Sequence, residues 1–406
     1  MRIDKPPRKK ILFLTPHMIS GGVEKSLINL LHCLPEEAYE VTVMMVKARG
    51  PFLKYIPDWV KIEELPLSED TKTELLTGGA RASVLRYLKK KDYFKALQVF
   101  LKKTLLKDPV PELMQPFSTV EELGNPFDFA IVYHMHMPFL IKYGAHRVQA
   151  SKKAAWIHND FSNSGFNPKP ISKDLECFNY FFAVSTQLEA EFKTFFPELG
   201  NRTRVMYNII SRNTIYSLAK SEKVSFPHLK ENETALLSIG RLDKQKGFDL
   251  AVKVCANLKK RGYAIKWYVL GEGKERKKLE ELIKSYGVQD YFFLEGFKEN
   301  PYPYLMKCDL YIQPSRHEGY CTTVIEAKCL AKPIISTRVA GAEEQINPNE
   351  TGLLVHFDGN EMTAAVEHML NNVQLREMFT ERLKKQQIDT DIEINKLMNL
   401  INEIET

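Results

Sequence analysis

Two carboxylates, Glu318 and Glu326, stand eight positions apart where the end of an apolar strand is expected to pass into a helix. If the segment were fully helical, eight residues would span roughly 12 Å at about 1.5 Å each, which would place one acid beside a sugar and the other beside a ribose. Both placements suit carboxylates, because these groups accept hydrogen bonds from vicinal hydroxyls. The spacing alone is equally compatible with a loop acid at Glu318 and an exposed helix position at Glu326.

The residues between the two acids are expected to open a helix N-terminus. Backbone N–H groups around Cys321, Thr322 and Thr323, together with the helix dipole, would bind a diphosphate without a metal ion. Gly319 would let the backbone approach such a ligand closely. Cys321 lies inside this phosphate loop, and we expect its backbone rather than its thiol to matter.

Alternating strands and helices are expected to position these residues. The apolar runs of each half of the chain predict a doubly wound sheet, with ligands beyond the carboxyl ends of the strands. Residues 16–22 and 158–160 would fall at such ends, and a polar connection over residues 211–233 separates the two halves. The clearest predicted helices are residues 23–34, 186–196, 248–260 and 276–286. The predicted strands are residues 10–15, 40–46, 129–134, 154–158, 180–184 and 203–207, then 235–239, 265–270, 291–294, 309–313, 333–336 and 352–355.

Size and composition describe an ordinary globular protein. Its 406 residues favour two or three domains, and 44% hydrophobic with 27% charged residues excludes a disordered or fibrous chain. Its six cysteines lack paired metal-ligand spacing, so reduced thiols and a cytoplasmic location are expected. The polar, basic N-terminus does not fit a signal peptide, and no apolar run is long enough to cross a bilayer. The net charge, 57 − 51 = +6, is compatible with anionic nucleotide substrates without requiring them.

Residues 81–107 concentrate the positive charge, with nine basic residues against one acid, Asp92, interleaved with leucines and aromatic residues. This pattern predicts one or two basic amphipathic helices. Such a surface is suited to anionic lipid headgroups, at the inner face of the cell membrane. A solvated helix packed on its own domain explains the pattern equally well.

Four segments follow one another in the order of a known family. They are Gly21-Gly22-Val23-Glu24, the segment from Ile239 to Gly247, the stretch around Glu318 and Glu326, and Gly341-Ala342-Glu343-Glu344. Together they resemble retaining nucleotide-sugar glycosyltransferases with the GT-B fold, namely glycosyltransferase family 4 (glycosyl transferases group 1) of the bacterial surface-polysaccharide type.

The resemblance implies an α/β chain of two Rossmann-like doubly wound domains facing each other across a cleft. Residues 1–210 would form the acceptor-binding domain, with a basic helical insertion at about 71–108. Residues 211–388 would form the nucleotide-sugar-binding domain, and residues 389–406 a helix that crosses back to pack on the first domain.

The resemblance also implies a role for each site residue. It assigns Arg241 and Lys246 to the diphosphate, whose developing charge a forked guanidinium and a point-charge ammonium both stabilise. Glu318 would contact the hydroxyls of the donor sugar, Glu326 the ribose, and His158 the vicinity of the sugar. The implied catalytic residues are His158, Glu318, Arg241 and Lys246. The implied donor-binding residues are Gly21, Gly22, Arg241, Lys246, Phe297, Glu318, Gly319, Tyr320, Cys321, Thr322 and Glu326.

The implied reaction moves a hexose or N-acetylhexosamine from a nucleotide-diphosphate sugar, expected to be UDP-linked, to a glycan or lipid-linked acceptor. A same-face displacement, in which the departing phosphate helps to deprotonate the acceptor, follows from the family alone. No cofactor, metal ion or nucleic acid is expected, since the only Asp-x-Asp, at residues 389–391, lies far from the phosphate elements. His134 and His136 alternate on an expected strand without obvious carboxylate partners.

Two departures from the family pattern stand out. Asn208-Ile209-Ile210 replaces the usual turn before the linker, and Tyr320-Cys321-Thr322-Thr323 replaces apolar residues after the first glutamate, which would alter the preference for the donor sugar. Two other functions remain alternatives. Gly271-Glu272-Gly273 invites a nicotinamide-dependent oxidoreductase, although the third glycine of that motif is missing. A non-catalytic protein that binds glycans or membrane surfaces would keep the same fold.

Overall fold

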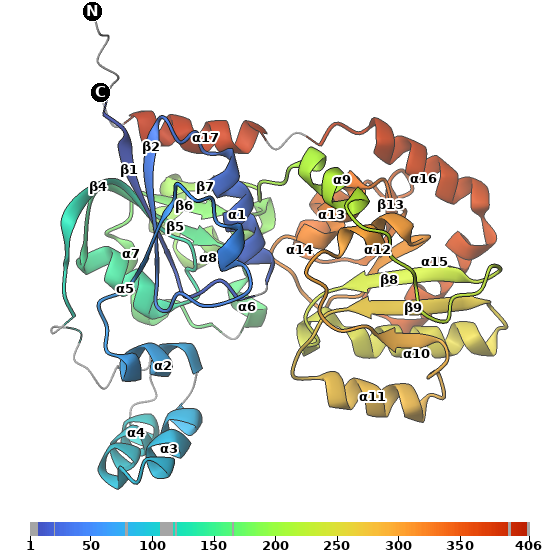
Figure 1. The fold of residues 1–406 in the computed structure, drawn as a ribbon, viewed down its shortest axis with the longest axis horizontal. Coiled ribbons are helices and arrows are strands. Elements are labelled where there is room, and N and C mark those ends of the chain that lie inside the picture. The colour runs from blue at the N-terminus through green and yellow to red at the C-terminus, as the bar shows by residue number, and fades with distance from the viewer. Residues whose placement is uncertain are drawn as a thin grey trace, which may run out of the picture. The chain divides into compact units, whose positions relative to one another are not determined.

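The computed structural model describes residues 7–19, 21–77, 80–105, 117, 120–164, 166–388 and 391–403. The chain divides into two compact units, which we call the N-terminal unit (residues 1–206 and 391–406) and the C-terminal unit (residues 207–390). Both units are α/β structures built on parallel sheets (Figure 1).

The sheet of the N-terminal unit has the strand order β3-β2-β1-β4-β5-β6-β7, and all of its pairs are parallel. Its strands are β1 (Lys9–Thr15), β2 (Tyr39–Met45), β3 (Lys61–Glu64), β4 (Leu123–Val132), β5 (Val148–Ile157), β6 (Tyr180–Ala183) and β7 (Thr203–Val205). Residues 11–14 of β1 are fully buried, as expected for a central strand with both faces covered by helices.

The helices of the N-terminal unit begin at recognisable signals. For example, the Ser185 side chain accepts a hydrogen bond from the Leu188 N–H at the start of α8. The described helices are α1 (Gly22–Cys33), α2 (Glu69–Thr77), α3 (Ala80–Lys89), α4 (Tyr93–Leu105), α5 (Pro138–His146), α6 (Phe161–Ser164), α7 (Ser172–Leu175), α8 (Thr186–Phe195) and α17 (Asp391–Asn402). Helix α17 belongs to this unit, since Lys9 Nζ donates to the Ile401 carbonyl at 3.2 Å.

The sheet of the C-terminal unit has the order β10-β9-β8-β11-β12-β13, again with parallel pairs only. Its strands are β8 (Thr234–Ile239), β9 (Ile265–Leu270), β10 (Phe292–Leu294), β11 (Leu310–Gln313), β12 (Ile334–Thr337) and β13 (Gly352–Val355). Its helices are α9 (Arg212–Lys220), α10 (Phe248–Lys260), α11 (Arg276–Ser285), α12 (Tyr302–Lys307), α13 (Thr322–Cys329), α14 (Ala340–Gln345), α15 (Gly359–Asn371) and α16 (Val373–Lys385), and a short 3-10 helix, η5 (Lys244–Lys246), precedes α10.

The strand order reverses at equivalent places in the two sheets. The reversal lies between β1 and β4 in one unit and between β8 and β11 in the other. Ligands of doubly wound sheets bind beyond the carboxyl ends of the strands at such switch points. The fold therefore selects the loops after these four strands as the places to look for a site.

Every strand of the C-terminal sheet lies where the sequence predicted it, within one residue at each end. Several expectations for the N-terminal sheet need correction. Strand β7 ends at Val205, two residues before its predicted end. Strands β4 and β5 begin earlier than predicted and end before His134 and His158, which therefore follow the strands rather than belong to them. Strand β3 was not predicted, because Lys61-Ile62-Glu63-Glu64 carries the charges that protect a sheet edge and lacks an apolar run.

The basic segment forms a helical hairpin of α3 and α4, up to residue 105. Asp92 begins α4 by accepting a hydrogen bond from the Lys95 N–H. Tyr87 and Ala96 are buried in the small core of the hairpin. Lys90 links the hairpin to α2 through an ion pair with Asp70 at 2.9 Å. None of the helices in the described part of the chain is long and apolar enough to cross a membrane.

Candidate functional site

The loop after β8 places the basic side chains of Arg241 and Lys246 at the carboxyl edge of the C-terminal sheet. Asp243 caps η5 by accepting a hydrogen bond from the Lys246 N–H at 3.2 Å. Gly247 ends this turn with a φ of 67°, and a Cβ there would lie 1.9 Å from the Pro314 carbonyl oxygen. Only glycine fits this position, so the loop is fixed against the segment that follows β11.

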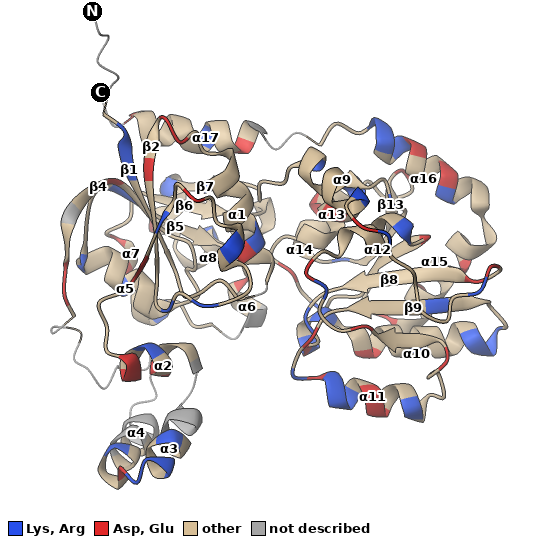
Figure 2. Ribbon diagram, in the orientation of Figure 1, with Lys and Arg blue, Asp and Glu red and all other residues tan. Residues whose placement is uncertain are grey.

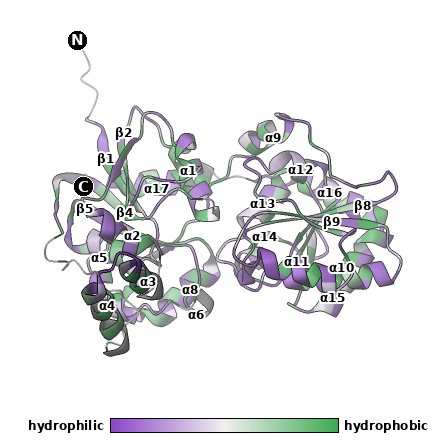
Figure 3. Cartoon of the chain, turned by 60° about the horizontal axis from the view of Figure 1, so that its bottom comes forward, coloured by the Kyte–Doolittle hydropathy of each residue, from purple (hydrophilic) through white to green (hydrophobic). Residues whose placement is uncertain are grey.

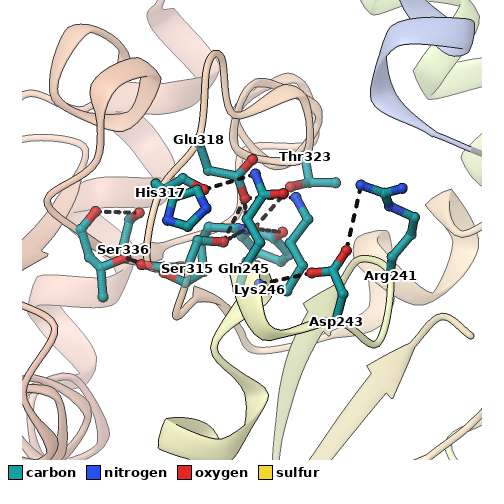
Figure 4. A network of polar contacts seen from close by, with 12 residues as sticks. Arg241, Asp243, Gln245, Lys246, Ser315, His317, Glu318, Thr323 and Ser336 are labelled. Carbon is teal, nitrogen blue, oxygen red and sulfur yellow. Dashed lines mark hydrogen bonds and ion pairs between the residues drawn. The ribbon is translucent and has the colours of Figure 1, made fainter. Parts of the chain in front are cut away.

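Lys246 and Glu318 form an ion pair of 2.6 Å, with 17% and 8% of their side chains exposed. Glu318 Oε1 also accepts hydrogen bonds from Ser315 Oγ at 2.6 Å and from Gln313 Nε2 at 3.1 Å. Figure 4 shows Lys246, Ser315 and Glu318 converging from two loops. Three donors on one oxygen hold this carboxylate in a single orientation.

Further contacts bind the two loops to each other. Arg316 donates through both guanidinium nitrogens to the Asp249 carboxylate at 2.8 and 2.7 Å, a bidentate pair. Gln245 Nε2 donates to the His317 carbonyl at 3.0 Å, and the Arg316 N–H donates to the Gln245 carbonyl at 2.7 Å. The chain around Glu318 is therefore held by the loop that carries Lys246.

Gly319, Tyr320 and Cys321 lead into α13, whose first residue is Thr322. The first N–H groups of a helix have no partner within it, so this end can bind an anion. A Cβ on Gly341 would lie 2.5 Å from Tyr320 Cα and 2.6 Å from the Cys321 nitrogen. Gly341 thus lets α14 pack directly on this backbone. Burial, with the nearby Glu318 charge, raises the pKa of Cys321, which is unsuited to act as a thiolate.

Glu326 is almost fully buried on α13, although the sequence also allowed an exposed helix position. Tyr302, from α12, donates to Glu326 Oε1 at 3.0 Å. A buried carboxylate requires such partners, because leaving an ion unpaired in the interior is costly. Glu318 lies in a loop, as the alternative allowed, but it is buried, and Glu326 is not the exposed helix position of that alternative. Both glutamates are oriented by neighbours.

Arg241 behaves differently from Lys246. Its side chain is 61% exposed and its one described ion pair, with Asp243, is 3.5 Å long. Figure 4 shows Arg241 extending away from the Lys246 and Glu318 network toward Asp243. Phe297 lies beyond β10, 42% exposed, after Gly296 with a φ of 76°. In the described part of the chain, neither residue has a hydrogen bond or ion pair to Lys246 or Glu318.

Gly271 and Gly273 have a packing role. A Cβ on Gly271 would lie 1.8 Å from the Gly240 carbonyl oxygen, and one on Gly273 would lie 2.4 Å from the Leu242 carbonyl oxygen. The ends of β8 and β9 therefore approach each other too closely for any side chain. This accounts for the two glycines without a dinucleotide, and the oxidoreductase alternative loses its motif.

Gly21 and Gly22 begin α1 in the N-terminal unit, directly after Ser20, which lies outside the described residues. A Cβ on Gly21 would lie 2.3 Å from Glu24 Oε2, so the Glu24 side chain folds back over the helix start. His17 Nδ1 lies 3.6 Å from Glu24 Oε1 and accepts a hydrogen bond from the Ile19 N–H at 3.3 Å. Burial and the Arg49 charge lower the pKa of His17.

His158 lies in a cluster of enclosed histidines beyond β4 and β5. Its ring centroid is 4.6 Å from that of Tyr133 and 6.2 Å from that of His134. Burial lowers the pKa of His134 to about 3 and that of His158 well below its usual value, with smaller contributions from the neighbouring histidines. Burial also lowers the pKa of His136, whose Nε2 lies 3.2 Å from the Asp160 carbonyl. These rings are therefore neutral at physiological pH.

The predicted site residues thus fall into two groups. Lys246, Glu318, the start of α13 and Glu326 come together in the C-terminal unit, whereas Gly21, Gly22 and His158 belong to the N-terminal unit. Sequence analysis missed three residues that hold the acids, namely Gln313, Ser315 and Tyr302. A polar glutamine at the end of the apolar run Leu310-Tyr311-Ile312 was the available signal.

In the described part of the chain, no three His, Cys, Asp or Glu side chains gather as metal ligands would. The Asp-x-Asp candidate includes Asp389 and Thr390, which lie outside the described residues. Metal independence stays a prediction.

Comparison with known proteins adds to this geometry. Residues 220–386 match the family model described as glycosyl transferases group 1. A segment of 185 residues is 31% identical to the N-acetylgalactosamine-N,N'-diacetylbacillosaminyl-diphospho-undecaprenol 4-alpha-N-acetylgalactosaminyltransferase of Campylobacter jejuni, covering 45% of this chain and 48% of that protein. The chain therefore spans about half the length of that relative.

A longer match has lower identity. An uncharacterized glycosyltransferase of Haemophilus influenzae is 25% identical over 395 residues, covering 95% of this chain and 97% of that one. Among solved structures, HepE of Anabaena in complex with UDP-glucose is similar with a TM-score of 0.69 and 16% identity, covering 97% of this chain and 99% of that chain. At this identity the likeness concerns the fold, which is GT-B.

Proposed function

Since its C-terminal unit carries the group 1 domain, the chain belongs to the group 1 glycosyltransferases, and we propose which reaction it performs. It transfers a hexose or N-acetylhexosamine, with retention of anomeric configuration, from a UDP-linked donor to a glycan or lipid-linked acceptor. The reaction serves the synthesis of cell-surface polysaccharide in the cytoplasm and requires no metal ion.

The Lys246–Glu318 pair beside the start of α13 is the observation that carries this proposal. A departing nucleoside diphosphate develops negative charge, which an ammonium and a helix N-terminus both stabilise. Lys246 can turn from Glu318 to a phosphate oxygen while Ser315 and Gln313 keep the carboxylate in place. The exposed Arg241 is able to add a guanidinium fork to the same diphosphate.

The contacts of Glu318 favour a binding role over a nucleophilic one. Its Oε1 accepts three hydrogen bonds, which occupy the lone pairs that a nucleophilic attack by this oxygen would use. Retention would then proceed by a same-face displacement in which the leaving phosphate accepts the acceptor proton. Glu326, oriented by Tyr302, would hold the ribose hydroxyls.

The N-terminal unit carries uncharged groups that suit a sugar. His158 is neutral, and the structure shows no hydrogen-bond partner for its Nε2. A neutral imidazole suits a sugar hydroxyl, because it can donate or accept without introducing charge. Gly21 and Gly22, which carry no side chains, would let a ligand approach the protein backbone at the start of α1 closely.

A donor screen tests the proposed function. The protein is titrated with UDP-glucose, UDP-galactose and their N-acetylated forms in EDTA, and release of UDP with candidate acceptors is then measured. We expect donor-dependent stabilisation, UDP release and an axial product by NMR. A response to NADH alone would instead support an oxidoreductase. Donor binding without turnover, unaffected by Glu326→Ala, would support a non-catalytic binding protein.

We also propose that the α3–α4 hairpin (residues 80–105) rests on the anionic inner face of the membrane. Tyr93 and Phe94 are 66% and 71% exposed, and Leu85, Leu88 and Leu97 are exposed beside them. Figure 2 shows basic residues along the hairpin and Figure 3 shows its hydrophobic stretches. Apolar side chains that insert between headgroups, flanked by lysines worth about 1 kcal/mol each, fit an anionic bilayer.

Vesicle flotation tests the hairpin. The protein should float with phosphatidylcholine vesicles that contain phosphatidylglycerol and much less with phosphatidylcholine alone. Phe94→Ser with Leu97→Ser should abolish flotation, and Lys89→Glu with Lys91→Glu should abolish its dependence on anionic lipid. Tyr216→Ser, which alters an exposed aromatic residue of the other unit, serves as the matched control. Self-association of the free protein that these changes abolish would point to a second copy instead.

A further inference from the structure

Gln313 is a buried polar residue that contacts Glu318 and has further partners besides. It ends β11, where it is 2% exposed behind the apolar residues Leu310, Tyr311 and Ile312. A buried amide is unfavourable unless its donors and acceptors find partners. Its contacts therefore explain why a glutamine occupies this position.

All four hydrogen-bonding positions of the Gln313 amide are used. Nε2 donates to Ser315 Oγ at 2.7 Å and to Glu318 Oε1 at 3.1 Å. Oε1 accepts from Tyr311 OH at 2.5 Å and from Thr323 Oγ1 at 2.9 Å. An ionised carboxylate only accepts hydrogen bonds, so Nε2 must face Glu318 and the amide has one orientation.

We propose that Gln313 is a positioning residue that orients the Glu318 carboxylate and couples it, through Thr323, to the first turn of α13. This inference rests on the proposed function, in which Glu318 binds the donor sugar and α13 binds the diphosphate. It extends that function by naming the residue that links the sugar subsite to the diphosphate subsite.

The geometry on Glu318 supports the role. Gln313 reaches Oε1 directly and again through Ser315, whose hydroxyl accepts from the amide and donates to Oε1 at 2.6 Å. Lys246 bonds the same oxygen. The contacts that orient the carboxylate therefore fall on Oε1, and Oε2 can accept a ligand hydroxyl without breaking them. When Lys246 turns to a phosphate, Gln313 and Ser315 still hold Oε1.

Thr323 explains a departure from the family pattern. A polar residue replaces an apolar one in the first turn of α13, and its hydroxyl donates to Gln313. The polar pair is self-consistent, because Thr323 supplies the second donor to the buried Gln313 carbonyl oxygen and Gln313 supplies an acceptor for the half-buried hydroxyl. A movement of α13 on binding a diphosphate would therefore shift Gln313 and, through it, the Glu318 carboxylate.

Two substitutions at Gln313 separate positioning from simple packing. Gln313→Met keeps the volume and removes all four hydrogen bonds. Gln313→Glu adds a carboxyl beside Glu318, and two carboxyls at this distance share one proton. The protonated form restores part of the amide's contacts, because its single O–H donates to Glu318 while its C=O accepts from Tyr311 and Thr323, and only the donation to Ser315 is lost. The other titratable groups facing this position are Lys246, Cys321 and Glu326.

Calorimetric titration with UDP and with the sugar donor that the screen selects supplies the measurement. The affinity for the sugar donor divided by the affinity for UDP isolates the contribution of the sugar. Gln313→Met should lower this ratio about tenfold or more, in line with loss of a hydrogen bond to a charged group. At pH 8, Gln313→Glu should lower the ratio as much as Gln313→Met does. At pH 5 its ratio should recover to within about threefold of the parent's, since protonation restores the donor to Glu318. Gln345→Met, a buried glutamine outside the network, should leave the ratio unchanged.

A ligand-free measurement keeps this inference distinguishable from the proposed function. The difference in thermal midpoint between Gln313→Glu and the parent should shrink as the pH falls from 8 to 5. If no UDP sugar binds the parent, the proposed function fails. The pH dependence of the thermal midpoints still tests whether Gln313 orients Glu318. A pH-independent difference, or a parental affinity ratio in Gln313→Met, would overturn the positioning role. Should Gln313→Met fail to fold, Thr323→Val provides the milder test, with an expected threefold loss in the ratio (about 0.7 kcal/mol).

Discussion

The two switch points of this protein share a topology and differ in chemistry. Beyond β8 and β11, charged side chains are tied together by short hydrogen bonds, with Lys246 and Glu318 at the centre. Beyond β1 and β4, the enclosed groups are neutral rings, with burial holding the pKa of His134 at about 3. Two parallel sheets whose strand orders agree over six strands thus offer one edge suited to a charged ligand and one suited to uncharged hydroxyls.

The difference arises from the loops and not from the sheets. Glycines allow backbones to approach closely in both units, as at Gly50 and Gly247, but in the C-terminal unit charged and polar side chains from separate loops meet there. In the N-terminal unit, Tyr133 fills the corresponding interior, and its OH lies 2.9 Å from Ser26 Oγ on α1. Aromatic packing excludes water there and keeps the imidazoles uncharged.

The largest effect is expected from removing the charge of the C-terminal edge. Lys246→Met should lower the rate of sugar transfer by about 10²- to 10³-fold, because it removes a cation that stabilises the leaving diphosphate. UDP release under saturating donor is the measurement, and Lys244→Met, on the same turn but exposed, is the control. A loss confined to the control position would contradict the assignment of the diphosphate site.

Next in size is the effect of filling the close approach of β8 and β9. Gly271→Ala places a Cβ 1.8 Å from a backbone carbonyl, so the strands must separate. We expect a loss of about 1–3 kcal/mol in the stability of the C-terminal unit, the usual cost of overpacking. Calorimetry should show a lowered transition, whereas Gly124→Ala, where the added Cβ meets nothing within 4 Å, should leave the trace unchanged.

A smaller effect is expected from loosening the second acid. Tyr302→Phe removes the 3.0 Å hydrogen bond to Glu326 while keeping the ring. The affinity for UDP should fall about tenfold, since hydrogen bonds to charged groups contribute about 1.5 kcal/mol or more. Isothermal titration measures this, with Tyr304→Phe on the same helix as control. An unchanged affinity would show that Glu326 does not depend on Tyr302 to bind ribose.

The last prediction tests the neutral edge, and the size of its effect depends on pH. A histidine whose folded-state pKa lies below its unfolded value contributes stability above about pH 6.5, and this stability is lost as the pH falls toward the folded pKa. Because burial lowers the pKa of His134 to about 3, the parent should lose up to about 1.4 kcal/mol per pH unit from this residue below pH 6.5. His134→Asn should flatten the pH dependence of urea unfolding between pH 4 and 6. Parallel curves would indicate that His134 does not titrate on unfolding.

Much of this arrangement was open to prediction from the sequence. Apolar runs located all six strands of the C-terminal sheet, because buried parallel strands require continuous apolar residues. The same rule missed β3, whose charged residues suit a sheet edge, and placed His134 and His158 inside strands that end just before them. The glycine-rich turn at Gly271 suggested a nucleotide motif, although its glycines serve close packing.

By itself, the sequence determined which residue types stand at the ends of the strands and in what order the motifs occur. Only the tertiary structure decided that Gln313 and Ser315 would hold Glu318, and that Tyr302 would hold Glu326. The physical reason is that element type follows from local periodicity, whereas these contacts depend on how separate strands and helices pack. Lys246 and Glu318 are 72 positions apart and meet only because β8 and β11 are neighbours in the sheet.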